Sequence, residues 1–286
     1  MSSLSPSAHE PVGRHLPPGS GNGGLVARVK GRHLRSLART TVVGVAPRRL
    51  GAVSPHLDDL ALSCGNFLAA HPGSSLATVF AGGPSRVDPL PSWDITCGAF
   101  QPGDDVVRIR RQEDLRAAEI LGAATRHLVH WDGQYREPDH GYTGPESDAL
   151  VQQIAADVKV MVQQLDVDAW LIPLGILHPD HRAVALACLE VATALPDVEW
   201  LVYEELPYAT AFPEHRDEAI GRLQGRGFAV HPGADAGTPR NEEAKRRAVD
   251  AYRTQLEALG PGVEEAIATP ERIGRLVCRL SDPGTT

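Results

Sequence analysis

The sequence predicts an α/β fold in which helices cover both faces of a mostly parallel sheet. From Leu50 onward, strand-like apolar runs alternate with segments of helical periodicity, which is typical of a sheet built from strand–helix–strand units. The run at 168–174 (DAWLIPL) is apolar almost throughout, as expected for a strand that is buried on both faces. The chain has 286 residues, of which 42% are hydrophobic and 22% charged, so a single three-layer domain with a sizeable core is possible.

Five strands are expected, each of them a short apolar run that ends at a turn or at the start of a helix. In chain order they are 50–54, 75–80, 126–131, 168–174 and 199–204. Because their connections are long enough to hold helices, most of these strands should lie parallel.

Helices are expected between and after these strands. They begin near Asp58 and continue with 105–121, 148–165, 181–195, 241–259 and 270–280. The clearest is 105–121, where apolar residues recur at helical spacing and Gly122 is a plausible stop. Residues 84–104 should form a long loop, and residues 209–240 should be irregular because they are rich in glycine.

Two segments precede the first strand. Residues 1–24 are rich in Ser, Pro and Gly and lack hydrophobic periodicity, which predicts a disordered tail. Residues 25–49 are rich in Arg and Lys and form either a solvated lead-in or a basic ligand site. Residues 25–286 are expected to form one domain.

Charge and cysteine usage exclude several classes of partner. The net charge of −8 and the pI of about 5.8 disfavour binding to nucleic acid. The four cysteines show no CxxC spacing, so neither a thiolate zinc site nor a redox pair is expected, and a reducing cytoplasm fits. No apolar stretch is long enough for a membrane span, and the first residues lack the apolar core of a signal peptide. We therefore expect a cytoplasmic protein, and the sequence does not indicate its oligomeric state.

Two short segments carry the residues that could perform chemistry. They are 54–59 (SPHLDD) and 177–181 (LHPDH), and each lies where a predicted strand ends and a helix begins. In open α/β sheets, ligands bind at this carboxyl edge of the strands. If the two strands are neighbours, their ends lie about 5 Å apart, or about 10 Å with one strand between them. Residues far apart in sequence could then face one crevice.

The residue types in these segments suit a hydrolytic metal site. Without cysteine, zinc prefers histidine nitrogen and carboxylate oxygen, and catalytic sites use three protein ligands and keep one position open. His56, Asp59 and His181 meet this requirement and are the predicted ligands of one Zn²⁺ per chain, or of another divalent metal. Taken singly, an aspartate at 58 or 59 is more commonly a helix N-cap, and His178-Pro179 a turn. Two helix starts that each carry His and Asp favour the metal site.

The remaining polar residues of the two segments are Asp58, His178 and Asp180, and they match the other needs of hydrolysis. A carboxylate beside the metal can take a proton from water, and an imidazole on the other side can stabilise an oxyanion or protonate the departing amine. Asp180 could fix the tautomer of His178 through a hydrogen bond.

The two segments resemble the paired HPDD and HPDH motifs of the GlcNAc-phosphatidylinositol de-N-acetylase family, also called PIG-L or LmbE-like proteins. The likeness extends from about Leu50 to Gln255, and Leu57 stands where the family's first motif has proline. It implies a Rossmann-like fold and zinc-dependent N-deacetylase or amidase activity. It also implies the following roles for residues of this chain: His56, Asp59 and His181 as metal ligands, Asp58 as general base, and His178, supported by Asp180, as acid or oxyanion stabiliser.

The activity implied by the resemblance is hydrolysis of an N-acetyl group on an N-acetylglucosamine-type sugar or a glycosylated small molecule, with release of acetate and a free amine. An amidase that cuts a larger amide, of the mycothiol-conjugate type, is an alternative within the same family. A non-catalytic Rossmann-like binding protein is an alternative of another class, although no GxGxxG motif follows the first strand.

Candidate substrate-binding residues lie outside the two segments. Arg111, in the helix that also carries Arg110, could hold a substrate oxygen, or it could belong to a solvated helix face. Trp93 and Asp94, on the long loop at 84–104, could form a platform for a sugar, or the tryptophan could pack the loop. Asp132 could reach the crevice or form a turn with the glycine that follows it.

Overall fold

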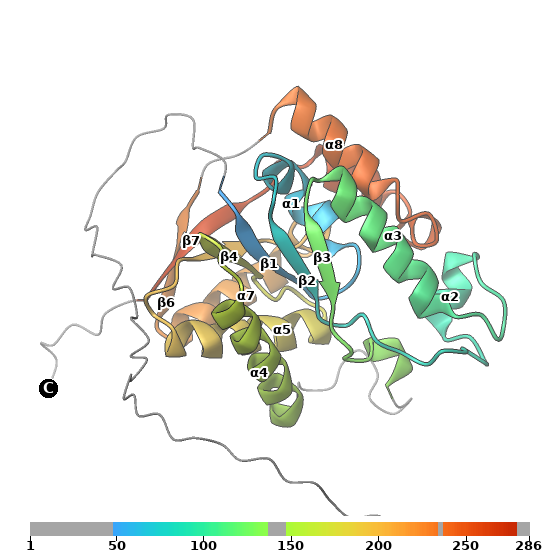
Figure 1. The fold of residues 1–286 in the computed structure, drawn as a ribbon, viewed down its shortest axis with the longest axis horizontal. Helices are drawn as coiled ribbons and strands as arrows, with labels where there is room; N and C mark the ends of the chain where they lie inside the picture. Colours follow the sequence, from blue (N-terminus) through green and yellow to red (C-terminus); the bar gives the residue numbers. More distant parts are fainter. Residues whose placement is uncertain (1–47, 137–146, 234–236, 279–286) are drawn as a thin grey trace, which may run out of the picture. The chain divides into compact units, whose positions relative to one another are not determined.

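The computed structural model describes residues 48–136, 147–233 and 237–278. The tail expected at residues 1–24 and nearly all of the basic segment at 25–49 lie outside the described residues. The described chain contains these strands: β1 (Leu50–Ser54), β2 (Ser75–Thr78), β3 (Ala124–His127), β4 (Ala169–Pro173), β5 (Trp200–Tyr203), β6 (Phe228–Pro232) and β7 (Ile273–Cys278). They form one sheet in the order β3-β2-β1-β4-β5-β7-β6 (Figure 1).

The sheet is mostly parallel, as predicted. Strands β1 to β5 run parallel to one another, whereas β7 is antiparallel to β5 and β6 is antiparallel to β7. The chain passes from β1 to β2 and β3 on one side and then returns to place β4 on the other side of β1. In such sheets, ligands bind in the crevice where the strand order reverses, and here this position is at the carboxyl ends of β1 and β4.

Helices cover both faces of the sheet. They are α1 (Asp59–Ala69), α2 (Ser92–Cys97), α3 (Val106–Ile120), α4 (Asp148–Gln164), α5 (Pro179–Ala194), α6 (Tyr208–Ala211), α7 (Pro213–Gly225), α8 (Pro239–Val249), α9 (Leu256–Leu259) and α10 (Gly262–Ala268), with a short 3₁₀ turn η1 (Gly133–Tyr135). Helices α1, α3 and α8 pack together on one face, and α4 and α5 on the other (Figure 1). This arrangement confirms the predicted three-layer α/β fold. Across the described ranges, no helix has both the length and the apolar character needed to cross a membrane.

The middle of the sheet is the centre of the core. Trp170, Leu171 and Ile172 of β4 are at most 1% exposed, which agrees with the apolar run that predicted this strand. Gly51 of β1 faces Trp170, and a Cβ atom at position 51 would lie 2.7 Å from three atoms of the indole ring. Glycine at position 51 therefore makes room for Trp170 between β1 and β4, the two strands whose ends lead to the site segments.

The predicted third strand is displaced. It was expected at 126–131, but β3 spans Ala124–His127, because its pairing partner β2 offers only Ser75–Thr78. Beyond β3 the chain leaves the ladder, apart from one bridge between Gly82 and Trp131. This departure carries residues 132 and 133 to the carboxyl edge of the sheet.

The carboxyl-terminal third also differs from the prediction. Residues 209–240 are not irregular, since they contain most of α6 together with α7 and β6, and the loop at 84–104 contains α2. The helix expected at 241–259 ends at Val249, and α9 is separate. The helix expected at 270–280 is wrong: Ile273 and Leu276 are buried while Arg275 is exposed, and the segment forms β7 between β5 and β6.

Candidate metal centre

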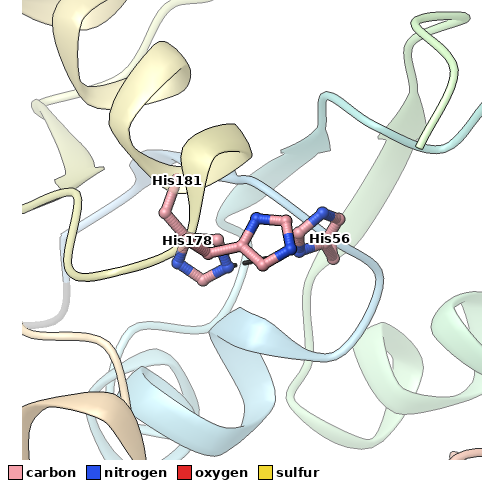
Figure 2. Close-up of side chains that lie close together, drawn as sticks. All are labelled: His56, His178 and His181. Carbon is pink, nitrogen blue, oxygen red and sulfur yellow. Dashed lines mark hydrogen bonds between the residues drawn. The ribbon is translucent and has the colours of Figure 1, made fainter. Parts of the chain in front are cut away.

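The fold brings the two sequence segments together. His56, Asp58 and Asp59 follow β1 and start α1, and His178, Asp180 and His181 start α5 after β4. Because β1 and β4 are hydrogen-bonded neighbours, both segments reach the same edge of the sheet. Figure 2 shows the imidazole rings of His56, His178 and His181 grouped in this place.

Local hydrogen bonds shape both segments. The Ser54 hydroxyl donates to the carbonyl of His56, and the backbone N–H of His56 donates to Asp59 Oδ2 at 2.7 Å, which closes a tight turn after β1. Helix α5 begins with His178 as N-cap and with Pro179 in the first position, where the missing N–H costs nothing.

Three atoms from these segments form a triangle. His56 Nδ1 lies 3.2 Å from His181 Nε2, and Asp59 Oδ2 lies 3.6 Å from the first and 3.3 Å from the second. Neighbouring ligands of a tetrahedral zinc with bonds of about 2.1 Å are about 3.4 Å apart. The donor types and their separations therefore fit a single divalent metal ion. Nitrogens of His56, His178 and His181 also lie within 4.8 Å of one another, which places His178 beside this triangle.

Two buried carboxylates orient the histidines. His56 Nε2 lies 3.1 Å from Asp180 Oδ2, and His181 Nδ1 lies 3.3 Å from Glu205 Oε1. A carboxylate can only accept, so each ring nitrogen that faces one carries the proton. When a metal occupies the triangle, the other ring nitrogen would supply its lone pair to that metal. The sequence prediction missed Glu205, for which the only available signal was an acidic residue directly after a buried strand.

Asp180 meets His178 through its backbone, whereas its carboxylate has other partners. The Asp180 carboxylate contacts His56, the backbone N–H of Gly133 and the guanidinium of Arg136. It is the backbone N–H of Asp180 that meets His178, donating to Nδ1 at 3.1 Å. The reason is helical geometry: the N-cap side chain accepts from the N–H two positions on, and the Asp180 side chain lies toward β1. A neutral His178 therefore carries its proton on Nε2.

Asp180 and His56 form a strongly coupled pair. Burial opposes the charged form of His56, but the hydrogen bond to Asp180 and the nearby carboxylates of Asp132 and Asp59 outweigh it and raise the pKa of His56 to about 10. Burial likewise opposes ionisation of Asp180, but the hydrogen bond from His56 and its positive charge hold the pKa of this carboxyl well below its usual range. The carboxylates around His56 make the crevice a favourable place for a cation.

Asp58 and His178 are shifted the opposite way, each toward its neutral form. Burial, together with the neighbouring charge of Asp59, raises the pKa of Asp58 to about 7. Burial and the positive charges of His56 and His181 lower the pKa of His178 to about 2. Asp58 therefore has a proton affinity suited to base catalysis near neutral pH, and His178 is a neutral hydrogen-bonding group.

The backbone before His178 is strained. Leu177 has a φ of 58°, and throughout the described ranges it is the only non-glycine residue with positive φ. A branched side chain rarely adopts this conformation, and residues that do so cluster at functional sites. Two residues earlier, Gly175 has a φ of 86°. The turn from β4 into α5 thus has a costly geometry that delivers His178 to the crevice.

Asp132 reaches the site as well as forming a turn. Its carboxylate accepts from the backbone N–H of Gln134 at 3.1 Å, as the N-cap of η1. Oxygen atoms of Asp132 and Asp180 also lie within 4.8 Å of a His56 nitrogen. Both interpretations of this residue from the sequence therefore hold.

The predicted substrate-binding residues lie in different environments. Asp94 is fully buried, 2.8 Å from the Arg110 guanidinium and 2.9 Å from the Tyr135 hydroxyl, so it supports the loop and does not face an open crevice. Trp93 is partly buried against a small apolar cluster separate from the main core. Arg111 donates through Nε to the carbonyl of Ala81 at 2.7 Å. Substrate binding by Trp93 and Arg111 stays a prediction.

Comparison with known proteins identifies the family of the chain. The PIG-L family model, described as GlcNAc-PI de-N-acetylase, matches residues 52–192, which include both segments. The 2'-N-acetylparomamine deacetylase of Niallia circulans is 30% identical over 243 residues, covering 75% of this chain and 82% of that enzyme. The 2'-N-acetylparomamine deacetylase of Streptomyces fradiae is 32% identical over 166 residues, covering 55% of this chain and 56% of that enzyme.

Solved structures give the same result for the fold. The zinc-inhibited form of teicoplanin deacetylase superposes with a TM-score of 0.66 at 26% identity, over 82% of this chain and all of that chain (100%). The deacetylase of the A40926 pseudoaglycone superposes with a TM-score of 0.65 at 27% identity, over 82% of this chain and 99% of that chain. From the family match, the relatives and the shared fold, the chain belongs to the PIG-L family of GlcNAc-PI de-N-acetylases.

Proposed function

We propose that this protein is a metal-dependent hydrolase that removes the N-acetyl group from an amino sugar or from a glycosylated small molecule. The observation that carries the proposal is the triangle of His56 Nδ1, Asp59 Oδ2 and His181 Nε2, with Asp58 next in sequence. The relatives support the substrate class, since they are deacetylases of acetylparomamine, of teicoplanin and of the A40926 pseudoaglycone. The bond broken would be a non-peptide amide C–N bond.

We assign His56, Asp59 and His181 as the ligands of one zinc ion per chain, with another divalent metal as the alternative. Histidine nitrogen and carboxylate oxygen are the zinc ligands that proteins use in catalytic sites. When bound, the metal supplies a Lewis acid that acidifies a water molecule and polarises the acetyl carbonyl.

Asp58 is the proposed general base. It takes a proton from water as the water oxygen forms a bond to the acetyl carbon, and it returns that proton to the nitrogen as the C–N bond breaks. His178, neutral and protonated on Nε2, donates a hydrogen bond to the oxygen on which negative charge develops. Asp180 keeps the His56 ring in place through its hydrogen bond. The products are acetate and a free amine.

Four broader expectations belong to the proposal. Residues 25–286 act as one domain, the partner is a small-molecule amide, and nucleic acid is not a partner because the net charge is −8. The protein acts in the cytoplasm, which fits its four free cysteines.

The test is acetate release by the purified protein. The protein is stripped with a chelator, reloaded with Zn²⁺ or Co²⁺, and offered 2'-N-acetylparomamine, N-acetylglucosamine and a mycothiol-type conjugate. We expect acetate and free amine from an acetamido sugar only in the reloaded protein. Cleavage of the thiol conjugate alone would replace the proposal with the amidase alternative. If the protein bound no metal and cleaved none of the substrates, the non-catalytic binding protein would be the remaining alternative.

A matched pair of variants tests the role of Asp58. Asp58→Asn should lose about 10²-fold to 10⁴-fold in kcat, as expected when a general base is removed. Asp105→Asn makes the same change at another helix N-cap, where the carboxylate accepts from the backbone N–H of Arg108, and it should keep its activity. Equal activity of both variants would remove Asp58 from the mechanism.

A further inference from the structure

Glu205 is a completely buried carboxylate beside the proposed centre. It lies two residues beyond the end of β5 at Tyr203, and neither it nor His181 is exposed (0% each). Burial of an ionisable side chain is costly unless hydrogen bonds or an opposite charge compensate it. The contacts of Glu205 therefore indicate what it does.

One oxygen of Glu205 meets three nitrogens. Oε1 accepts from the backbone N–H of Gly175 at 2.7 Å and of Ile176 at 3.2 Å, and it lies 3.3 Å from His181 Nδ1. The second oxygen, Oε2, is buried and has no hydrogen-bond partner among the described residues. The hydrogen bonds of Glu205 are thus concentrated on the side that faces His181 and the turn into α5.

The contact with His181 selects a tautomer. With a cation in the triangle, Nε2 of His181 supplies its lone pair to that cation, and the ring proton stays on Nδ1, where the Glu205 carboxylate can only accept it. Nε2 is the atom that lies 3.2 Å from His56 Nδ1 and 3.3 Å from Asp59 Oδ2. Glu205 thereby prepares the imidazole to bind a cation and adds negative charge behind it.

The contacts with Gly175 and Ile176 fix the turn that ends at His178. This turn includes Leu177 at a φ of 58°, a conformation that surrounding contacts must hold. The same oxygen therefore anchors both the ring of His181 and the backbone that presents His178.

We propose that Glu205 is a positioning residue of the metal centre: it fixes the Nδ1–H tautomer of His181, strengthens metal binding at Nε2 and holds the turn that carries His178. This inference rests on the proposed function, because it takes His181 as a metal ligand. It assigns to Glu205 the part that Asp180 has for His56, so each histidine of the triangle has its own carboxylate partner.

The experiment compares Glu205→Gln with Glu204→Gln. Glutamine keeps an oxygen for the N–H groups of the turn but removes the charge behind His181. Glu204 is the next residue in sequence, and its carboxylate pairs with Arg216 instead of the site. Metal affinity is measured on folded protein by competition with a chelating dye, and the visible spectrum of the Co²⁺ form reports its coordination.

We expect Glu205→Gln to bind metal about 10-fold to 100-fold more weakly, with an altered Co²⁺ spectrum, and Glu204→Gln to match the wild type. Equal affinity and equal spectra of all three proteins would overturn the inference and leave the proposed function standing. A wild-type protein that binds no metal would instead overturn the proposed function itself.

A second measurement does not depend on the variant folding. In the metal-loaded wild-type protein, NMR of nitrogen-labelled histidine distinguishes a ring bound through Nε2 from one bound through Nδ1. We expect His181 bound through Nε2 with its proton on Nδ1 and His56 bound through Nδ1. Coordination of His181 through Nδ1 would overturn the inference.

Discussion

Asp180 Oδ2 lies 3.1 Å from His56 Nε2, so an aspartate at the start of α5 holds a histidine that follows β1. The two residues are 124 positions apart in sequence. The hydrogen bond joins the two segments of the site across the β1–β4 boundary and directs Nδ1 of His56 toward Asp59 and His181. Removing the carboxylate should therefore affect the metal more than the fold.

Asp180→Ala is expected to weaken metal binding about 10-fold to 100-fold, since outer carboxylates that orient histidine ligands contribute on this scale. Chelator competition on the purified variant measures the affinity. Asp157→Ala is the control, because Asp157 also pairs with a histidine, His130, at 2.8 Å but is 48% exposed on α4. If both variants bind metal like the wild type, the orienting role of Asp180 is refuted.

His178→Ala should lower kcat about 10²-fold to 10³-fold while the metal content stays near one per chain. The expected loss is that of a hydrogen-bond donor to an oxyanion. Steady-state kinetics and metal analysis of the same preparation measure the two quantities. Loss of the metal together with the activity would instead make His178 a ligand. This is a possible outcome because a His178 nitrogen lies within 4.8 Å of the nitrogens of His56 and His181.

Gly51→Ala should destabilise the protein by about 1 to 3 kcal/mol, which is typical of overpacking in a core. The new methyl group would lie 2.7 Å from the ring of Trp170, and that ring is only 1% exposed and has no room to move. Gly221→Ala on α7 is the control, because a Cβ atom there meets nothing within 4 Å. We expect this helical substitution to stabilise by about 0.5 to 1 kcal/mol. Urea unfolding of both variants gives the comparison, and an unchanged Gly51→Ala would contradict the packing argument.

Lys245→Ala should cost about 3 to 5 kcal/mol of unfolding free energy, because it leaves the buried charge of Glu271 without its partner. Lys245 Nζ lies 3.2 Å from Glu271, and both side chains are at most 1% exposed. Arg246→Ala removes the next residue, whose pair with Glu264 is exposed, and should cost less than about 1 kcal/mol. Denaturant unfolding of the two variants measures these free energies. Equal losses of unfolding free energy in both variants would contradict the prediction that the buried pair matters more.

The same pair predicts a pH dependence. Burial raises the pKa of Glu271 above its ordinary value, although Lys245 and two backbone N–H groups of α1 oppose the shift. The folded protein therefore binds this proton more tightly than the unfolded chain, and its contribution to stability falls as the pH rises from the ordinary value of 4.5 through the raised pKa. Without Lys245 the pKa rises further, so the deficit of Lys245→Ala should be smaller near pH 5 than near pH 8. If the stability deficit of Lys245→Ala grew as the pH fell, the prediction would be wrong.

The sequence predicted the central strands and the site segments best, because one physical signal dominates in each of them. The apolar run at 168–174 identified β4, because a strand covered on both faces needs apolar residues at nearly every position. The site segments were identified because two helix starts after such strands each carry both histidine and aspartate, a combination that helix capping alone does not explain. Their convergence in the structure follows from β1 and β4 being neighbours.

The errors arise where tertiary context overrides local pattern. The segment at 270–280 has apolar residues compatible with a helix, but β5 leaves an edge that needs a partner, and β7 pairs there. The sequence linked Asp180 to His178, and the backbone N–H of Asp180 makes that contact, but the direction of its side chain on the first turn of α5 brings the carboxylate to His56. The sequence did not predict the role of Glu205, because a single acidic residue after a strand has no characteristic spacing from His181.

The separation of the two site segments also sets the order of events during synthesis. His56 and His181 are 125 residues apart, and no triangle exists until β4 has docked beside β1 and α5 has begun. At translation rates of about 5 to 20 residues per second, His56 waits about 6 to 25 seconds for its partner. Under the proposed function, the metal site is complete only after β1 to β4 have been synthesised, so ion binding follows the formation of this part of the sheet and does not nucleate it.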